Sequence, residues 1–312
     1  IKSSSVTQTG PLNIAAIAEL DLEQTASTVG TYSGALNGLG LLSINKNGNT
    51  GRVALTGSST FLGPAVVHAG ELQATPANLP DTVAVNSNAL VDLEQSAGSG
   101  TYDGVISDNG PGQHGAVAIN KHGGSGTVVF TGANHYTGGT TVYNGALQGT
   151  TSTVKGNIHV NTGATVDFEQ ETGTGKYTGV ISGAGGVVIN SIGGNTGTVE
   201  FTGRNTYSGG TLVSGGTLRG DSRSLQGVIT DNATVEFSQH VDGIFNGSFA
   251  GNGIIEKKGL GRLAFVFDSS AFTGTTNIRL GRLDLDTVLG GDIIVHEGGI
   301  LGGNGTVLGD LT

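Results

Sequence analysis

Three pairs of acidic residues are the first groups in this chain that could perform chemistry. An Asp and a Glu two positions apart recur at Asp21/Glu23, Asp92/Glu94 and Asp167/Glu169. On a strand, such residues share a face about 6.5–7 Å apart, and glycosidases hold two carboxyl groups about 5–9.5 Å apart. The spacing therefore allows the acid pair of a carbohydrate-active enzyme. However, an active site is normally made once, so a slot that recurs three times favours a solvated scaffold face.

Histidine and serine give weaker signals. His114, His122 and His135 lie close in sequence, but they lack the spacing of metal ligands, and the chain has no cysteine. His68 and His296 fall in a recurring structural position that is described below. No Gly-x-Ser-x-Gly motif leads from a strand into a helix, so serine-hydrolase chemistry is not indicated. The sequence therefore predicts no catalytic residues, no metal site and no cofactor.

Two further features could bind a partner. Tyr32, Tyr102, Tyr136, Tyr177 and Tyr207 recur at fixed positions, where they could stack on glycans or simply pack beside corner glycines. The segment "GTLRGDS" (216–222) contains Arg219, Gly220 and Asp221, a tripeptide that integrin-type receptors can bind. It aligns with "GELQATP" (70–76) and "GALQGTT" (145–151). This recurrence favours a solvated turn after a strand, and receptor binding by Arg219, Gly220 and Asp221 is the alternative.

Composition and charge limit the class of protein. The chain has 312 residues, of which 58 are glycine and 5 proline, and only 12% are charged. Abundant Val, Ile, Thr and Gly are typical of many short strands joined by turns. The formal net charge of −10 disfavours binding to nucleic acid, and no apolar run is long enough for a membrane helix. Methionine is absent, so we expect the chain to be a section of a longer protein.

The sequence repeats with a period near 70 residues. "DLEQ" at 21–24 returns at 92–95, as "DFEQ" at 167–170 and as "EFSQ" at 236–239. The resulting repeats are about 5–75, 76–150, 151–221 and 222–286, with a partial repeat at 287–312. All of them are assigned to one domain, 1–312.

A shorter period lies within each repeat. A short apolar strand leads to a polar residue, which we call the anchor position, and successive steps between anchors are long, medium and short. The anchors are Ala15, Asn45, His68, Asn86, Asn120, Asn144, Asn161, Asn190, Ser214, Asp231, Lys257, Leu280 and His296. Coils of about 23 residues are typical of a parallel β-helix. We therefore predict an all-β solenoid of about 12–13 rungs, three per repeat, whose long coils carry loops near 96–116, 171–186 and 238–253.

Two segments resemble a known family. "FTGANHYTGGTTVYNGALQG" (130–149) and "FTGRNTYSGGTLVSGGTLRG" (201–220) resemble the passenger-associated transport repeat of Gram-negative autotransporters. The equivalent segments of the first and fourth repeats are degenerate, because they lack one or both paired glycines. The ending "GGILGGNGTVLGDLT" (298–312) is similar to the segment that often precedes the last passenger rungs and the membrane barrel. The resemblance implies a pertactin-like, right-handed β-helix displayed on, or shed from, the outer membrane, with the signal peptide and C-terminal barrel missing.

The sequence thus favours a non-enzymatic, rigid stalk on the bacterial surface. Its expected role is adhesion to a host-cell receptor or extracellular matrix, or self-association between passengers, without nucleic acid and with membrane attachment only through the missing barrel. The zero cysteine count fits a chain that must cross the outer membrane unfolded. Two alternatives stay open: a carbohydrate-active enzyme on the same fold, and an inert spacer that carries an upstream effector domain.

Overall fold

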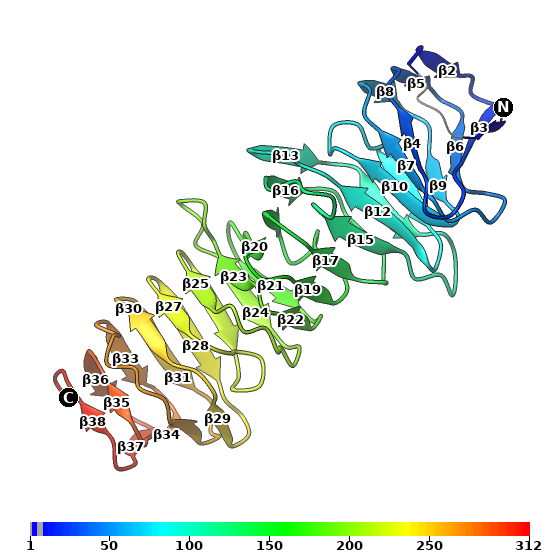
Figure 1. Ribbon diagram of the computed structural model, residues 1–312. Coiled ribbons are helices and arrows are strands. Elements are labelled where there is room, and N and C mark those ends of the chain that lie inside the picture. The colour runs from blue at the N-terminus through cyan, green and yellow to red at the C-terminus, as the bar shows by residue number, and fades with distance from the viewer. Residues whose placement is uncertain (1, 5–8) are drawn as a thin grey trace. The chain divides into compact units, whose positions relative to one another are not determined.

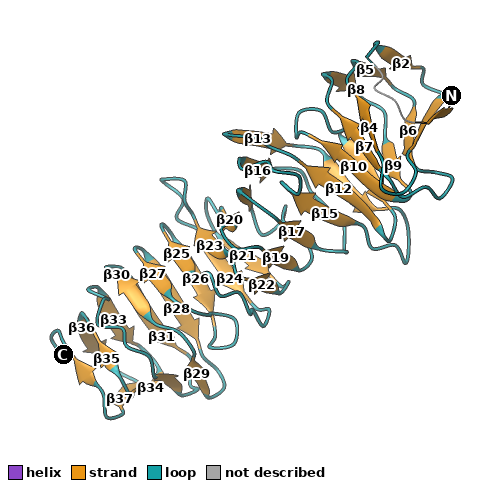
Figure 2. Cartoon of the chain, in the orientation of Figure 1, coloured by secondary structure: helices purple, strands orange, loops and turns teal. Residues whose placement is uncertain are grey.

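The computed structural model describes residues 2–4 and 9–312, so the predicted start of the first repeat near residue 5 lies outside the described residues. All regular secondary structure in this described part is β-strand, and its strands pair in parallel (Figures 1 and 2). The predicted parallel β-solenoid is therefore confirmed. A helix able to cross a bilayer is not found among these residues. The chain forms two compact units, which we call the N-terminal block (Ile1–Ala164) and the C-terminal block (Thr165–Thr312).

The N-terminal block winds its strands around three sides. The first side consists of β1 (Lys2–Ser4), β3 (Glu19–Glu23), β6 (Leu41–Ile44), β9 (Ala65–Val67), β11 (Thr82–Val85) and β14 (Val105–Asp108). The second consists of β4 (Val29–Tyr32), β7 (Arg52–Leu55), β10 (Gly70–Ala74), β12 (Ala89–Leu93), β15 (Ala116–Ile119), β17 (Thr140–Val142) and β19 (Ile158–Val160). The third holds two short sheets, β2 (Leu12–Ile14), β5 (Leu36–Gly38) and β8 (Ser59–Phe61), then β13 (Ser99–Tyr102), β16 (Thr127–Phe130) and β18 (Ala146–Gly149).

The C-terminal block is built in the same way. One side consists of β20 (Thr165–Phe168), β23 (Gly186–Ile189), β25 (Thr211–Val213), β27 (Ile229–Asp231) and β30 (Phe249–Gly251). The next, which we call the threonine face, consists of β21 (Thr174–Tyr177), β24 (Thr198–Phe201), β26 (Thr217–Gly220), β28 (Thr234–Ser238), β31 (Ile254–Lys258), β33 (Thr275–Ile278) and β36 (Asp292–Val295). The remaining strands are β22 (Ile181–Gly183), the sheet β29 (Gly243–Phe245), β32 (Leu263–Phe265), β34 (Gly281–Leu285) and β37 (Gly299–Gly302), and the pair β35 (Val288–Leu289) and β38 (Thr306–Val307).

The interior of each block is a column of aligned apolar side chains. Leu72, Val91 and Val117 occupy matching positions on β10, β12 and β15, and none is more than 1% exposed. Full burial of one such side chain contributes about 1.5–3 kcal/mol. Because each coil contacts only its neighbours, stability accumulates coil by coil.

The anchor position moves from one side of the solenoid to the next at every long step. In the N-terminal block, the anchors Asn45, His68 and Asn86 follow β6, β9 and β11 on the first side, and the next three, Asn120, Asn144 and Asn161, follow β15, β17 and β19 on the second side. In the C-terminal block, Asn190, Ser214 and Asp231 lie at the ends of β23, β25 and β27, and Lys257, Leu280 and His296 lie at or near the ends of β31, β33 and β36, on the threonine face. Each long step is therefore one turn plus a third of a turn.

This shift corrects two sequence predictions. The structure has about 15 turns rather than 12–13, because each repeat makes three and one-third turns. The segments 96–116, 171–186 and 238–253 are not simply protruding loops. They contain β13 and β14, β21 and β22, and β29 and β30, respectively. A long step in sequence cannot distinguish a long coil from a coil with one additional side, because both use the same number of residues.

A buried asparagine at the anchor position joins three successive coils. The Oδ1 of Asn120 accepts a hydrogen bond from the Gln95 N–H (2.8 Å), and its Nδ2 donates to the carbonyls of Gly126 (2.8 Å) and Asn144 (3.0 Å). Asn45 and Asn190 make the equivalent bonds. All three have φ between 52° and 55°, a left-handed conformation that asparagine adopts more readily than other non-glycine residues. Asparagine therefore suits this position for two reasons: its side-chain amide bonds to the neighbouring coils, and its backbone tolerates a positive φ.

A lysine takes this place in the fourth repeat. The Nζ of Lys257 donates to the carbonyls of Gly259 (2.7 Å) and Leu280 (2.9 Å), so the cross-coil bonds are retained by a different side chain. Lys257 is fully buried, and burial lowers its pKa to about 8. The need for a donor between coils is therefore more general than the need for asparagine.

We expect Asn120→Ala to lower the free energy of unfolding by about 3 kcal/mol, because three backbone groups at the corner lose their partner and alanine is strained at this φ. Asn144→Ala is the matched control. Asn144 occupies the next anchor, is exposed, and donates a single 3.4 Å bond within the described residues, so its loss should change stability by less than about 0.5 kcal/mol. Urea unfolding followed by circular dichroism measures both variants. Equal effects would show that the buried asparagine does not hold the coils together.

Asp231 makes the stability of the C-terminal block depend on pH. Its carboxyl group is fully buried, its Oδ2 has no hydrogen-bond partner among the described residues, and burial raises its pKa to about 7. An unfolded aspartate loses its proton near pH 4. Stability that is present below about pH 4 is therefore lost as the pH rises through 7.

We expect Asp231→Asn to stabilise the chain more at pH 8 than at pH 4, because the amide stays neutral. The equivalent anchor Asn86 donates to the carbonyl of His68 (3.1 Å), so an amide already fits this position. Thermal melting of both proteins at the two pH values provides the measurement. A gain in melting temperature that is the same at both would contradict a raised pKa of Asp231.

Candidate functional site

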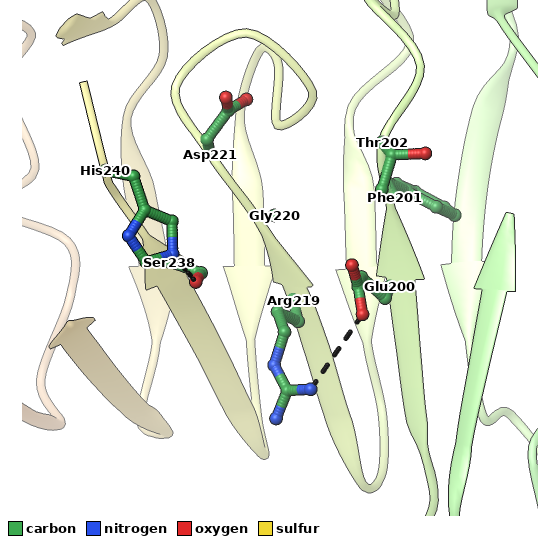
Figure 3. Close-up of a pocket in the computed structure, with 8 residues that line it drawn as sticks. All are labelled: Glu200, Phe201, Thr202, Arg219, Gly220, Asp221, Ser238 and His240. Carbon is green, nitrogen blue, oxygen red and sulfur yellow. Dashed lines mark hydrogen bonds and ion pairs between the residues drawn. The ribbon is translucent and has the colours of Figure 1, made fainter. Parts of the chain in front are cut away.

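The Arg-Gly-Asp segment lies at the junction of a strand and a turn. Arg219 and Gly220 are the last residues of β26, and Asp221 comes immediately before the turn. The predicted turn is therefore correct for Asp221, whereas Arg219 belongs to the strand and projects outward from the threonine face. Figure 3 shows Arg219 directed toward Glu200, with Asp221 at the other end of the group.

Arg219 lies in a row of alternating charges, which we call the charge row. It is in register with Glu200 on β24 and Glu236 on β28. Its Nε lies 2.8 Å from Glu236 Oε1, and its Nη1 lies 4.0 Å from Glu200 Oε2. Lys176 extends the row beyond Glu200 (3.7 Å), and Lys258 contacts Glu236 (2.9 Å). Burial opposes ionisation of Glu236, but hydrogen bonds from Lys258 and Arg219 hold its pKa below the usual value.

Asp221 caps the turn that follows. Its Oδ1 accepts hydrogen bonds from the N–H groups of Arg223 (2.9 Å) and Ser224 (3.0 Å). In the second repeat, Thr150 occupies the equivalent position. Its hydroxyl accepts hydrogen bonds from the N–H groups of Ser152 and Thr153 in the turn that follows (3.2 Å each). Asp221 thus performs a structural task that another residue type performs elsewhere in the chain.

Gly220 is required by a close approach. A Cβ at this position would lie 2.4 Å from Ser224 Oγ and 2.8 Å from Leu225 Cδ2, so a larger residue would push the turn away. Gly149 is equally close to its own turn, with Thr153 Oγ1 at 2.6 Å. Each member of the tripeptide therefore has a role in the solenoid. Receptor binding by Arg219, Gly220 and Asp221 stays a prediction.

A shallow pocket of about 220 Å³ lies over this junction. The residues that line it are Glu200, Phe201, Thr202, Arg219, Gly220, Asp221, Ser238 and His240 (Figure 3). His240 Nε2 lies 3.2 Å from Ser238 Oγ. The charge-row residues that line the pocket, Glu200 and Arg219, are already engaged in the ion pairs that Arg219 forms with Glu200 and Glu236. Most of the side chains that line the pocket are polar or charged.

The repeated acid pairs are covered rather than solvated, which corrects the sequence prediction. Asp21 and Glu23 are each 7% exposed, because the turn of the next coil lies over them. The amide of Asn47 donates to Asp21 Oδ2 (2.9 Å) and to Glu23 Oε1 (2.7 Å). In the third repeat, the Ser191 hydroxyl lies within hydrogen-bond distance of both Asp167 and Glu169. These carboxylates hold a turn against the coil before it.

The second repeat departs from this pattern. Glu71, Asp92 and His122 each bring one ligand atom within 4.8 Å of the others. His122 Nε2 lies 2.5 Å from Glu71 Oε1 and 3.9 Å from Asp92 Oδ2. Neighbours in sequence gave no sign of this cluster, because Glu71 is 51 residues from His122. A comparison between repeats would have marked it, since Glu71 and His122 have no counterparts in the other repeats.

The recurring tyrosines are buried, as the packing alternative predicts. Tyr32, Tyr102, Tyr136, Tyr177 and Tyr207 are at most 4% exposed, so none is available to stack on a glycan. A Cβ on Gly104 would lie 2.6 Å from the ring of Tyr102, which places that ring beside a corner glycine. The hydroxyl of Tyr136 bonds Thr140 (2.7 Å), and that of Tyr207 bonds Thr211 (2.6 Å). The aromatic rows therefore belong to the core.

Comparison with known proteins agrees with this architecture. Residues 45–74, 123–148, 195–219 and 255–285 match the passenger-associated-transport-repeat family. The matches include the first and fourth repeats, in which the paired glycines are incomplete. Each match ends in the strand that follows a medium step, namely β10, β18, β26 or β34.

Two relatives extend the similarity beyond these segments. The adhesin BmaC autotransporter of Brucella suis biovar 1 (strain 1330) is 31% identical over 204 residues, covering 64% of this chain and 5% of BmaC. The uncharacterized lipoprotein YdeK of Escherichia coli (strain K12) is 26% identical over 341 residues, covering 96% of this chain and 24% of YdeK. This chain thus spans only a small part of either relative. The chain thus carries four passenger-associated transport repeats on a parallel β-solenoid and is similar to an autotransporter adhesin, as the sequence resemblance predicted.

Proposed function

We propose that this chain is a section of a rigid passenger, exported to the bacterial surface, that acts in adhesion through a flat strand face and not as an enzyme. The main support comes from separating the side chains that already have a structural role from those that remain for contact with a partner. The tyrosines are buried, two of the acid pairs hold turns, and each member of the Arg-Gly-Asp tripeptide has a structural contact. The outward residues of the strands remain for contact with a partner. The similarity to BmaC, whose name describes an adhesin, supports the same role.

The threonine face offers the most regular surface for such contacts. Thr174, Thr198, Thr217 and Thr234 lie in register on four successive strands, one strand spacing of about 4.8 Å apart. The charge row runs beside them. Short polar side chains on a flat sheet allow close approach, and repeated weak contacts along it add up to avidity.

The alternation of charges along the charge row favours contact with a second copy of this chain over contact with a receptor whose surface carries charges of one sign. Along the charge row, Lys176, Glu200, Arg219 and Glu236 alternate in sign. A second copy displaced by one strand would bring unlike charges opposite each other, whereas a uniformly charged surface would meet as many repulsive as attractive contacts. We therefore place contact between passengers first and contact with a host surface second.

We expect the double variant Thr198→Arg/Thr217→Arg to reduce aggregation of beads coated with this chain about tenfold, because long charged side chains keep two flat faces apart. The matched control is Thr101→Arg/Thr127→Arg, on outward positions of β13 and β16 in the N-terminal block. Aggregation is measured by light scattering, and attachment to epithelial cells by counting beads. Equal behaviour of both double variants would contradict the role of the threonine face, and an inert wild-type chain would favour the spacer alternative.

The same assays separate the tripeptide from the face. Asp221→Thr removes the receptor motif and keeps a capping hydroxyl, as at Thr150. We expect unchanged folding by circular dichroism and unchanged attachment to epithelial cells. Loss of attachment by this well-folded variant would establish that Arg219, Gly220 and Asp221 bind a receptor.

A further inference from the structure

Three side chains from separate coils meet on the second side of the N-terminal block. Glu71 lies on β10, Asp92 on the next strand β12, and His122 on the turn after β15. Their ligand atoms form a triangle with no side longer than 4.8 Å. One imidazole nitrogen and two carboxylates are a donor set that protein metal sites use. The parallel register of three coils, and not a local motif, creates the cluster.

Asp92 has a buried oxygen without a donor. Its side chain is 0% exposed, and Oδ2 accepts no hydrogen bond within the described part of the chain. This oxygen faces His122 Nε2 at 3.9 Å. Leaving a buried carboxylate oxygen without a partner is costly, so its position calls for a proton or a cation.

In the first and third repeats, a side chain of the turn donates to one oxygen of the equivalent aspartate: the Asn47 amide to Asp21 Oδ2, and the Ser191 hydroxyl to Asp167 Oδ2. The other oxygen of Asp21, like Asp92 Oδ2, has no hydrogen-bond partner among the described residues, so what is particular to the second repeat is the histidine that faces this oxygen.

In the second repeat the turn is still held by Glu94, whose Oε2 accepts the Gly124 N–H (2.9 Å). The backbone N–H of His122 also holds the turn by donating to Glu94, so the imidazole, which lies where Asn47 supplies an amide in the first repeat, is not needed for this task.

Glu71, which lies near the end of the first repeat on the strand beside β12, is equally singular. Its aligned positions in the next two repeats are Ala146 and Thr217. In the other repeats the acid pair has a structural role. In this one a further carboxylate and a histidine converge on the pair, as expected of a binding site that is made once.

The local charge balance favours a dication. Glu71, Asp92 and Glu94 carry three negative charges when ionised, and Lys121, whose Nζ lies 2.5 Å from Glu71 Oε2, supplies one positive charge. In the state that binds a metal ion, with a neutral imidazole and all three carboxyl groups ionised, the cluster would hold a net charge of about −2. A single divalent ion would cancel it.

We propose that Glu71, Asp92 and His122 bind one divalent transition-metal ion, for which Zn²⁺ has the best fit. Zinc takes nitrogen and oxygen ligands at about 2.0–2.2 Å in a tetrahedron, so its ligand atoms lie about 3.3 Å apart. The Glu71–His122 distance of 2.5 Å would open and the Asp92–His122 distance of 3.9 Å would close, each by less than about 1 Å. Lys121 is 28% exposed and can turn to solvent. Three protein ligands leave the fourth position to water or to a group on a partner.

Calorimetric titration of the tag-free, metal-stripped chain with Zn²⁺ tests the site. We expect one ion per chain, and a loss of affinity of at least about tenfold in His122→Ala and in Glu71→Gln, as each removes one of three ligands. His114→Ala is the matched control, because His114 is exposed and contacts Thr137 instead of the cluster. Co²⁺ is the spectroscopic probe, and its visible absorption should report tetrahedral nitrogen and oxygen ligation in the wild type but not in His122→Ala.

Several outcomes would overturn the proposal. These are an absence of Zn²⁺ binding to the wild-type chain, unchanged affinity in both ligand variants, or equal affinity for Mg²⁺ and Zn²⁺. The last result would describe a general acidic patch, because Mg²⁺ prefers oxygen ligands and has little use for the histidine. A rise in the melting temperature with Zn²⁺ that is absent in His122→Ala would support binding to the folded chain.

Discussion

The backbone groups of a solenoid, and many of its buried polar side chains, find their partners on the coil before or after their own, and this constraint governs the structure. Backbone N–H and C=O groups meet it through the parallel strand ladders. Where the ladder stops at a corner, side chains continue it. Asn120 reaches from the Gln95 N–H in one direction to the Asn144 carbonyl in the other, and Lys257 performs part of the same task with an amine. The acid pairs act similarly, since they hold the turn of the neighbouring coil.

The same constraint explains why conspicuous motifs have structural roles. Polar residues recur at fixed spacing because each repeat presents the same unpaired groups at the same corners. Asp221 and Thr150 satisfy equivalent turns with different chemistry. Function in such a scaffold therefore has to come from flat outward rows, or from a position where one repeat departs from the others. Glu71 and His122 form such a departure.

Much of the fold could be predicted from the sequence. The repeat of "DLEQ", the glycine corners and the buried tyrosines follow from local pattern, because strand alternation and turn chemistry depend on neighbours in sequence. The additional third of a turn could not be predicted, since it depends on which side the chain has reached. For the same reason the pairing of Arg219 with Glu200 and Glu236, and the meeting of Glu71 with His122, required the register between coils.

Amide hydrogen exchange tests the central claim, that polar side chains bond coil to coil at the anchor positions. The N–H groups of Gln24, Gln95 and Gln170, each bonded to an anchor asparagine, lie just beyond their strands. If these bonds join the coils, the three amides exchange as slowly as those within β12 and β15, and much more slowly than those of the exposed segment 110–112. Exchange of these three glutamine amides at the rate of the exposed segment would contradict it.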